Sequence, residues 1–151
     1  MSGMEALGRL FNLVPNAVSH PFKMRGASGV AIVAIGADAV VTVKEDSTFG
    51  GSFATTLAVV KNIYWAAAND GTAAWKKLTP ASPLGTWTHG AGGTTGLTTA
   101  VVTVAHVFTS EMSDPNDYLK ITCTGTSPVC YAIPYDLVTQ RGPANLEILG
   151  A

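Results

Sequence analysis

The sequence predicts an all-β protein, an antiparallel β-sandwich or barrel preceded by a short N-terminal helix and an extended arm. About seven short runs rich in β-branched residues follow one another from Val30 onward, and turn signals separate them roughly every ten residues. The chain has 151 residues, enough for one domain with its own core. We divide it into a helix and arm (1–29), a β domain (30–141) and a C-terminal tail (142–151).

Charged residues are scarce along the whole chain. They make up 13% of the residues, whereas an average soluble domain has about 25%. A monomer exposed on all sides normally carries more charge, so we expect other protein to cover part of the surface. The net charge of −1 attracts neither nucleic acid nor anionic membranes. No apolar run approaches the roughly 18 residues that a membrane-spanning helix needs.

The first 29 residues predict a helix of two to three turns followed by an arm. The apolar residues that share one helical face are Leu7, Leu10, Phe11 and Val14. Pro15 ends the helix, and residues 15–29 show no periodicity, so we expect them to be extended. The segment also lacks the basic start and the cleavage site of a secretion signal, which predicts synthesis and residence in a cytoplasm.

The next segment predicts two strands and then a hairpin. The runs 30–35 and 39–46 are β-branched and end in turn residues. Residues 57–68 lead into Asn69-Asp70-Gly71, a strong hairpin signal, with a return strand over 73–79. This hairpin would bring Trp65 and Trp75 together as a cross-strand aromatic pair.

The second half of the chain predicts a loop and three further strands. Residues 80–98 contain two prolines and a glycine-rich run and are expected to form a loop. The three strands are expected at 99–108, 118–124 and 129–138, with an Asp-Pro-Asn-Asp turn before the second.

Both cysteines lie in the stretch Cys123-Thr-Gly-Thr-Ser-Pro-Val-Cys130, which predicts the tip of a hairpin. A turn centred on Thr126-Ser127 would place the cysteines opposite each other, within reach of a disulfide. Because a cytoplasm is reducing, we expect free thiols, with a structural disulfide as the second alternative. Two thiols cannot complete a zinc site, the three histidines show no ligand spacing, and the Cys-x-x-Cys of redox centres is absent.

The sequence contains no motif that indicates catalysis or a cofactor. The glycine-rich run 89–96 is followed neither by a Lys nor by a helix, so an inter-strand loop is expected rather than a phosphate cradle. The acidic pairs Glu45-Asp46 and Asp114/Asp117 are typical of solvated turns.

His106 alternates with Val104 and Phe108 on an expected strand, which predicts a buried or interface histidine. An enzyme would need a His within hydrogen-bond reach of a Ser, Asp or Glu inside a pocket. We therefore expect a protein that is not an enzyme and that holds no cofactor and no metal.

Three tryptophans and two tyrosines suggest a different function. Trp65, Trp75 and Trp87, with Tyr64 and Tyr118, are candidates for the sugar-stacking platform of a carbohydrate-binding β-sandwich. That alternative requires the tryptophans to lie exposed in a row. Core packing or a protein interface explains them equally well.

Apolar segments at both ends of the chain favour a subunit of an assembly. The residues that we expect to contact a partner are Leu10, Phe11, Val14, Phe22, Leu146 and Ile148. Packing inside the same subunit is the alternative for each of them.

The strand Tyr118-Leu-Lys-Ile-Thr122, a Gly-containing turn, the strand ending in Asp136-Leu-Val-Thr-Gln-Arg141, and Gly142-Pro-Ala-Asn-Leu146 resemble the C-terminal part of small virion proteins of tailed bacteriophages. The resemblance covers the last third of the chain. Similar proteins are mostly head-decoration (cement) or minor capsid proteins that form oligomers, often trimers, and brace the major capsid protein.

The resemblance implies that the chain is made in the host cytoplasm and resides in the virion as a homo-oligomer. Its partner would be the major capsid protein or another virion protein. A tail or head–tail joining protein is the alternative within the same class.

Overall fold

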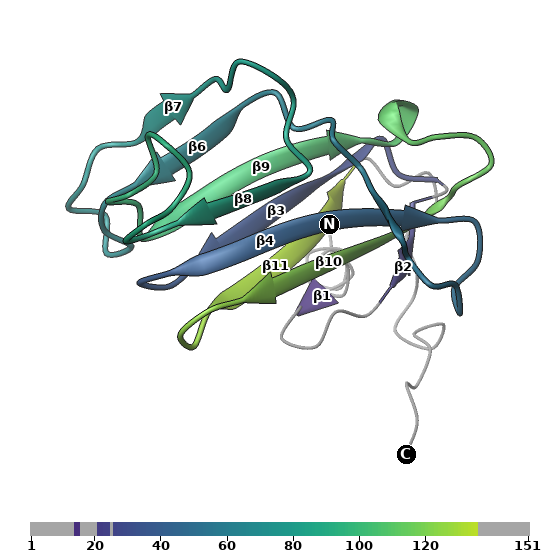
Figure 1. Ribbon diagram of the computed structural model, residues 1–151, viewed down its shortest axis with the longest axis horizontal. Coiled ribbons are helices and arrows are strands. Elements are labelled where there is room, and N and C mark those ends of the chain that lie inside the picture. The colour runs from purple at the N-terminus through teal and green to yellow at the C-terminus, as the bar shows by residue number, and fades with distance from the viewer. Residues whose placement is uncertain (1–13, 16–20, 25, 136–151) are drawn as a thin grey trace, which may run out of the picture.

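A computed structural model shows a nearly all-β chain with two antiparallel sheets, one behind the other in the view of Figure 1. The structure describes residues 14–15, 21–24 and 26–135. The expected helix before Val14 and the tail 142–151 lie outside the described residues, as do Leu10, Phe11, Leu146 and Ile148.

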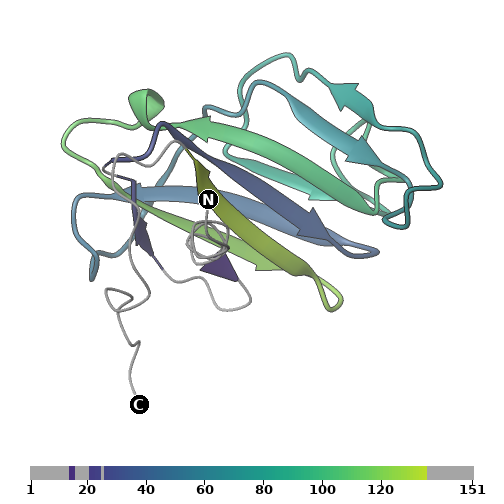
Figure 2. The ribbon, with the colours of Figure 1, turned by 180° about the vertical axis from the view of Figure 1, so that it is seen from behind.

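The larger sheet, sheet A, has six antiparallel strands in the order β1-β11-β3-β9-β6-β7. Its strands are β1 (Val14–Pro15), β3 (Gly29–Ile35), β6 (Ile63–Ala66), β7 (Lys76–Leu78), β9 (Val102–Phe108) and β11 (Val129–Tyr135). A 3₁₀ turn, η1 (Thr109–Glu111), follows β9. Figure 2 views the molecule from the side of this sheet.

The smaller sheet, sheet B, is built around β4. Its strands are β2 (Phe22–Lys23), β4 (Ala39–Asp46), β5 (Thr55–Thr56), β8 (Thr86–His89) and β10 (Tyr118–Thr124). Strand β10 pairs with one edge of β4, and β5 and β8 share the other edge. Strand β2 extends the sheet beyond β10.

The two sheets share one hydrophobic core. Alternate residues of β3 and β4 are buried, as the β-branched pattern requires. Val30 and Ile32 come from sheet A, and Val41, Val43 and Ile121 come from sheet B, all within the same cluster. Burial of each such side chain stabilises the fold by about 1.5–3 kcal/mol, so the core holds the sheets face to face.

The N-terminal arm pairs with the chain's own sheets. Val14 is in strand β1, which pairs with β11, so the prediction that this residue belongs to a helix is wrong. Strand β2 pairs with β10, and Met24 after it is fully buried. Both short strands form hydrogen bonds with backbone groups of β11 and β10, which would otherwise be edge strands. These parts of the arm therefore belong to the fold of the chain itself.

The predicted hairpin at the cysteines does not form. Strand β10 pairs with β4 and β11 pairs with β3, so Cys123 lies opposite Val41 and Cys130 opposite Ala34. The turn between them crosses from one sheet to the other, because each strand buries one face and the two buried faces meet across the core. Its backbone takes positive φ at Gly125 and Ser127.

Three further predictions in the middle of the chain need correction. Residues 86–89, expected in a loop, form β8, whereas residues 57–60 form no strand of their own. Trp65 pairs with Lys76 rather than with Trp75, and the Lys76 ammonium lies 4.8 Å from the centre of a Trp65 ring. Trp75 lies outside β7 and is 59% exposed, so the aromatic pair is absent.

Candidate functional site

The outward-facing surface of sheet A, here called the outer face of sheet A, is mostly apolar. Along β9, Thr103, Ala105 and Val107 are buried, so their neighbours point away from the core. The same alternation in the other strands gives the rest of the face. Its members are Ala31, Val33, Ile35, Tyr64, Lys77, Val104, His106, Phe108, Val129, Tyr131, Ile133 and Tyr135.

The register of the strands lines these side chains up in rows. Tyr64 pairs with Val104, Val104 with Val33, and Val33 with Tyr131, which makes one row across four strands. His106, Ala31 and Ile133 make the next row. Side chains in such rows lie within reach of their neighbours, so the apolar residues of the face are grouped across β3, β9 and β11 and end at Lys77 on β7.

The outward-facing surface of sheet B has a different composition. The outward residues of its two long strands and of β8 are mostly threonines and lysines. They include Thr42, Lys44, Thr86, Thr88, Lys120, Thr122 and Thr124. Polar residues on the solvent side are what an antiparallel sheet with one wet face requires, so only sheet A departs from that rule.

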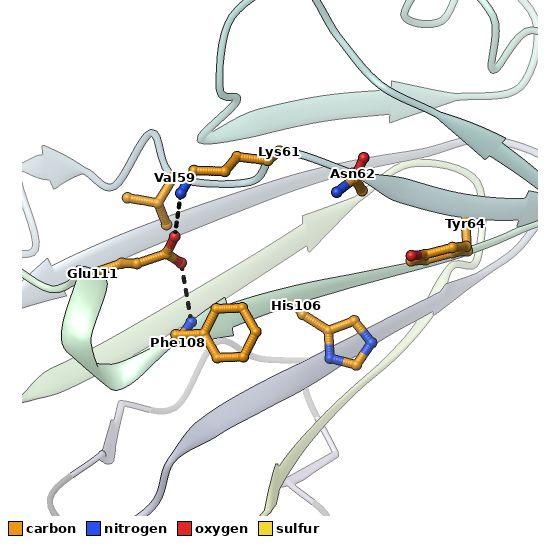
Figure 3. Close-up of a pocket in the computed structure, with 7 residues that line it drawn as sticks. All are labelled: Val59, Lys61, Asn62, Tyr64, His106, Phe108 and Glu111. Carbon is orange, nitrogen blue, oxygen red and sulfur yellow. Dashed lines mark hydrogen bonds and ion pairs between the residues drawn. The ribbon is translucent and has the colours of Figure 1, made fainter.

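A shallow groove with a volume of about 190 Å³ lies at one end of the outer face of sheet A. Tyr64 from β6 and His106 and Phe108 from β9 line its floor, as Figure 3 shows. Tyr64 is 39% exposed and Phe108 is 47% exposed. Both rings therefore present apolar area that the subunit leaves uncovered.

Glu111 fixes the rim of this groove. Its Oε1 accepts a hydrogen bond from the Lys61 ammonium at 2.9 Å, and its Oε2 accepts one from the Phe108 backbone N–H at 3.2 Å. The carboxylate thereby holds η1 against the end of β9. An ion pair this exposed contributes about 0.2–1 kcal/mol to stability, so its role is to order the rim.

His106 lies on this exposed face, so the prediction of burial is wrong for it, and an interface role remains a prediction. Its ring meets the Tyr135 ring edge-on, with 6.0 Å between centroids. Within the described part of the chain, no hydrogen bond joins His106 to a Ser or to a carboxylate.

His89 is fully buried and belongs to a polar chain between the two sheets. The Trp87 Nε1–H donates to Thr103 Oγ1 at 3.2 Å, His89 Nδ1 lies 3.1 Å from the same hydroxyl, and His89 Nε2 lies 3.1 Å from the Gly36 carbonyl. A carbonyl oxygen only accepts, so Nε2 carries the proton and the Thr103 hydroxyl donates to Nδ1.

Burial lowers the pKa of His89, against smaller opposing effects of the Gly36 carbonyl and the Asp38 carboxylate. The ring nitrogens of Trp87 and His89 and the Thr103 hydroxyl all have hydrogen-bond partners in this network.

The tryptophan platform of a carbohydrate-binding module does not form. Trp65 and Trp87 are buried in the core, and Trp75 is the exposed member of the three. A row of exposed tryptophans is therefore missing, because the alternation of β6 and β8 turns two of the rings inward.

The acidic residues that were expected in solvated turns differ in their burial. Asp46 accepts the backbone N–H groups of Thr48 and Phe53, which lower its pKa, so its turn role is confirmed. Asp114 is exposed, as expected of a turn residue. Glu45 is only 2% exposed, so the prediction of a solvated turn is wrong for it; its Oε2 accepts the Ser113 backbone N–H at 2.9 Å.

Cys123 and Cys130 are thiols without a disulfide between them, and their side chains meet across the core. Cys123 is half-buried and Cys130 is buried. The hydrogen bond with Cys130 lowers the pKa of the Cys123 thiol, and partial burial opposes that shift. The two cysteines are not joined by a disulfide, as expected, but they face each other from two sheets and not from paired strands of one hairpin.

Two of the six expected partner contacts fall on described residues. Phe22 lies opposite Leu119 and packs against the core of its own chain while remaining partly exposed. Val14 is fixed by its backbone pairing with Ala132. Contacts of these residues with a partner stay predictions.

The outer face of sheet A was missed as a site from sequence. The sequence did contain a signal for it. In β3, β9 and β11 the outward-facing positions are mostly apolar, as are the buried positions that alternate with them.

Within the described residues, no helix has the length and apolar character needed to cross a membrane. Comparison of the chain with protein-family models, with curated proteins and with solved structures gives no match.

Proposed function

We propose that this chain is a non-enzymatic structural subunit that binds other protein through the outer face of sheet A. The observation that carries the proposal is the contrast between the two sheets: the outer face of sheet A is mostly apolar, and that of sheet B is covered by threonine and lysine. Tyr64, Phe108, Val129 and Ile133 are exposed on this face, and grouped exposed apolar residues are typical of interaction sites. The low charge of the chain has the same explanation.

The groove beside Tyr64, His106 and Phe108 suits a side chain of a partner better than a free ligand. Its volume of about 190 Å³ falls below the roughly 300–1,000 Å³ of ligand pockets. Exposed aromatic rings next to a shallow hollow are typical of the centre of a protein interface. Tyr64 and Phe108 are accordingly the proposed anchors.

The setting that we propose is the particle of a tailed bacteriophage, where the chain forms a β-sandwich subunit that decorates and stabilises the capsid. Its partners are the major capsid protein and further copies of itself, in a trimer or another homo-oligomer. This setting rests on the resemblance of the C-terminal third, while the interaction surface rests on the structure. A tail or head–tail joining protein uses the same kind of surface and is the alternative.

The interaction surface is tested by sedimentation of the purified chain and of matched variants. We expect the chain to self-associate, and Tyr64→Ser and Phe108→Ser each to weaken association at least tenfold. Phe49→Ser is the control, because Phe49 is also 47% exposed but follows β4 of sheet B. Equal effects of Phe108→Ser and Phe49→Ser would exclude the outer face of sheet A as the contact surface.

The virion setting is tested separately, by mass spectrometry of phage particles banded in a density gradient from cultures that produce the chain. We expect many copies of the chain per particle, in the head fraction after heads and tails are separated. Recovery in the tail fraction would favour the joining or tail alternative. Recovery only as soluble protein would contradict the virion setting.

A further inference from the structure

The two cysteines lie at the end of the core where residues 125–128 cross from sheet B to sheet A. Cys123 is on β10 and Cys130 is on β11, and each occupies the side of its strand that alternates with outward residues and faces the core. Cys130 belongs to the buried core cluster, and Cys123 packs against that cluster. The two thiols are hydrogen-bonded to each other. They therefore form a direct side-chain contact between the two sheets.

The turn between the strands holds this contact in place. The Asp38 carboxylate accepts the Thr126 backbone N–H at 2.8 Å and the Thr126 hydroxyl at 3.3 Å. Gly125 packs so closely on the turn before β4 that a Cβ added to it would lie 2.5 Å from the Asp38 carbonyl oxygen. Strands β10 and β11 are each paired along their whole length. The backbone that carries the two thiols is thus fixed on both sides of the turn.

The step from this contact to a disulfide is short. A disulfide needs sulfur atoms about 2.05 Å apart and Cβ atoms about 3.5–4.5 Å apart. Thiols in hydrogen-bond contact already face each other, and each sulfur moves with the χ1 torsion of its own side chain. Closing the bond therefore calls for rotation of two side chains, while the strand pairing of β10 and β11 stays as it is.

The two thiols differ in their access to solvent. Cys123 is half-buried, whereas Cys130 is only 2% exposed. The hydrogen bond with Cys130 lowers the pKa of the Cys123 thiol, against the opposing effect of burial, and the thiolate is the form that attacks a disulfide. Cys123 is thus the thiol that a reagent in solution meets first, and Cys130 is placed to react with the product.

We propose that Cys123 and Cys130 form a reversible disulfide that joins sheet A to sheet B when the chain meets a small-molecule disulfide such as oxidised glutathione. The Cys123 thiolate attacks one glutathione sulfur and displaces the first glutathione thiolate, which leaves Cys123 bonded to glutathione. Cys130 then loses its proton, attacks the Cys123 sulfur and displaces the second glutathione thiolate. The two protein thiols lose two electrons and two protons, and both pass to glutathione, which leaves as two thiols.

The proposed bond responds to the redox state of the surroundings. In a reducing compartment the thiols stay apart, and in an oxidising one the bond closes. This inference does not depend on the proposed function, because it concerns two side chains of one subunit.

The test is an equilibrium titration of the full chain with mixtures of reduced and oxidised glutathione, in buffer and in urea that unfolds the chain. Mass spectrometry of the tryptic peptide 121–141, which contains both cysteines, measures the fraction with the bond closed. Cysteines this near in sequence also pair in an unfolded chain, so the readout is the ratio of the two conditions. We expect the effective concentration of one thiol at the other to be at least tenfold higher in the native chain, because the fold already holds them in contact. An equal or lower value in the native chain would overturn the proposal.

Two matched variants test the order of attack. With oxidised glutathione, Cys130→Ser should accumulate a stable mixed disulfide on Cys123. Cys123→Ser should form one on Cys130 at least ten times more slowly, because that thiol is buried. Equal rates in the two variants would overturn the role of Cys123 as the attacking thiol. A disulfide between two chains, in place of one within a chain, would overturn the proposal as a whole. The titration of the natural chain decides the proposal without any substitution.

Discussion

At the scale of single residues, Thr103 connects the two sheets through polar groups. Its hydroxyl accepts from Trp87 and donates to His89, and all three side chains are buried. Sheet A supplies the threonine and sheet B supplies both partners. A buried polar network of this kind stabilises the fold only while every polar group in it has a hydrogen-bond partner. The Thr103 hydroxyl is the partner of both the Trp87 and the His89 ring.

We expect Thr103→Val to destabilise the protein strongly. The substitution keeps the shape but leaves the Trp87 N–H and one His89 nitrogen without partners, at a cost of about 2–5 kcal/mol. Urea unfolding measures this free energy. The control is Thr86→Val on β8, where the threonine is exposed and bonds only to the exposed Thr42 hydroxyl, and its expected change stays within about 0.5 kcal/mol. Equal losses in both variants would contradict the network.

The lowered pKa of His89 predicts a loss of stability in acid. In the unfolded chain a His takes up a proton near pH 6.5, whereas folded His89 does so only at lower pH. Between these two values the unfolded state binds more protons, so stability falls as pH falls. Above about pH 6.5 the effect vanishes.

The slope is at most about 1.4 kcal/mol per pH unit. The measurement is the free energy of unfolding from pH 8 to pH 5 for the natural chain and for His89→Gln, which cannot be protonated. We expect the natural chain to lose more stability than the variant below pH 6.5. Parallel pH profiles would show that His89 does not titrate differently in the folded state.

At the scale of elements, the two short strands of the arm, β1 and β2, pair with the edges of the long strands β11 and β10. Strands β1 and β2 extend sheets A and B next to β11 and β10, the strands that the cysteine turn joins. Asp38, in the turn between β3 and β4, accepts the Thr126 backbone N–H at 2.8 Å and so ties the two sheet-crossing turns together. The arm and the turns thus determine where both sheets end.

Truncation should distinguish the arm from the segment before it. Removal of residues 1–13 leaves every described strand in place, so we expect a chain that still folds. Removal of residues 1–29 deletes β1, β2 and the fully buried Met24. Loss of a buried Met side chain alone costs about 2–5 kcal/mol, against a total of about 5–15 kcal/mol.

We therefore expect the longer truncation to abolish cooperative thermal unfolding, as followed by circular dichroism. A sharp unfolding transition in the chain of residues 30–151 would show that the arm is not part of the fold. The shorter truncation is the internal control, because it removes only residues that precede β1.

At the scale of the whole molecule, the two sheets present unlike surfaces to the surroundings. Sheet B resembles the wet side of an ordinary antiparallel sheet, and sheet A exposes valine, isoleucine and aromatic side chains. Burial of such a surface is driven by removal of apolar area from water. In the proposed assembly, the same asymmetry would direct the outer face of sheet A toward the partner.

Association through the outer face of sheet A should carry the thermodynamic signature of apolar burial. We expect a negative heat-capacity change on association and little dependence on salt. Dilution calorimetry between 10 and 35 °C and sedimentation at about 50 and 500 mM NaCl measure these quantities. A tenfold weakening at the higher salt concentration would indicate a contact made by charges instead.

The sequence alone determined the strands with long β-branched runs and the residues that they bury. The run from Ala39 to Asp46 forms β4 over the expected range, and Tyr118–Thr124 forms β10. Alternation is a local property, so it can be read along one strand without knowledge of the others. The same alternation indicates which residues of β9 point outward.

Only the tertiary structure decided which strands are neighbours. Cys123 and Cys130 lie on strands joined by a short turn, yet they belong to different sheets. Residues 86–89 are a strand because they pair with β4, and Trp87 and His89 on this strand bond to Thr103 across the core. Pairing and burial of polar groups depend on partners far away in the chain, and the apolar outer face of sheet A became visible only when the register placed its rows side by side.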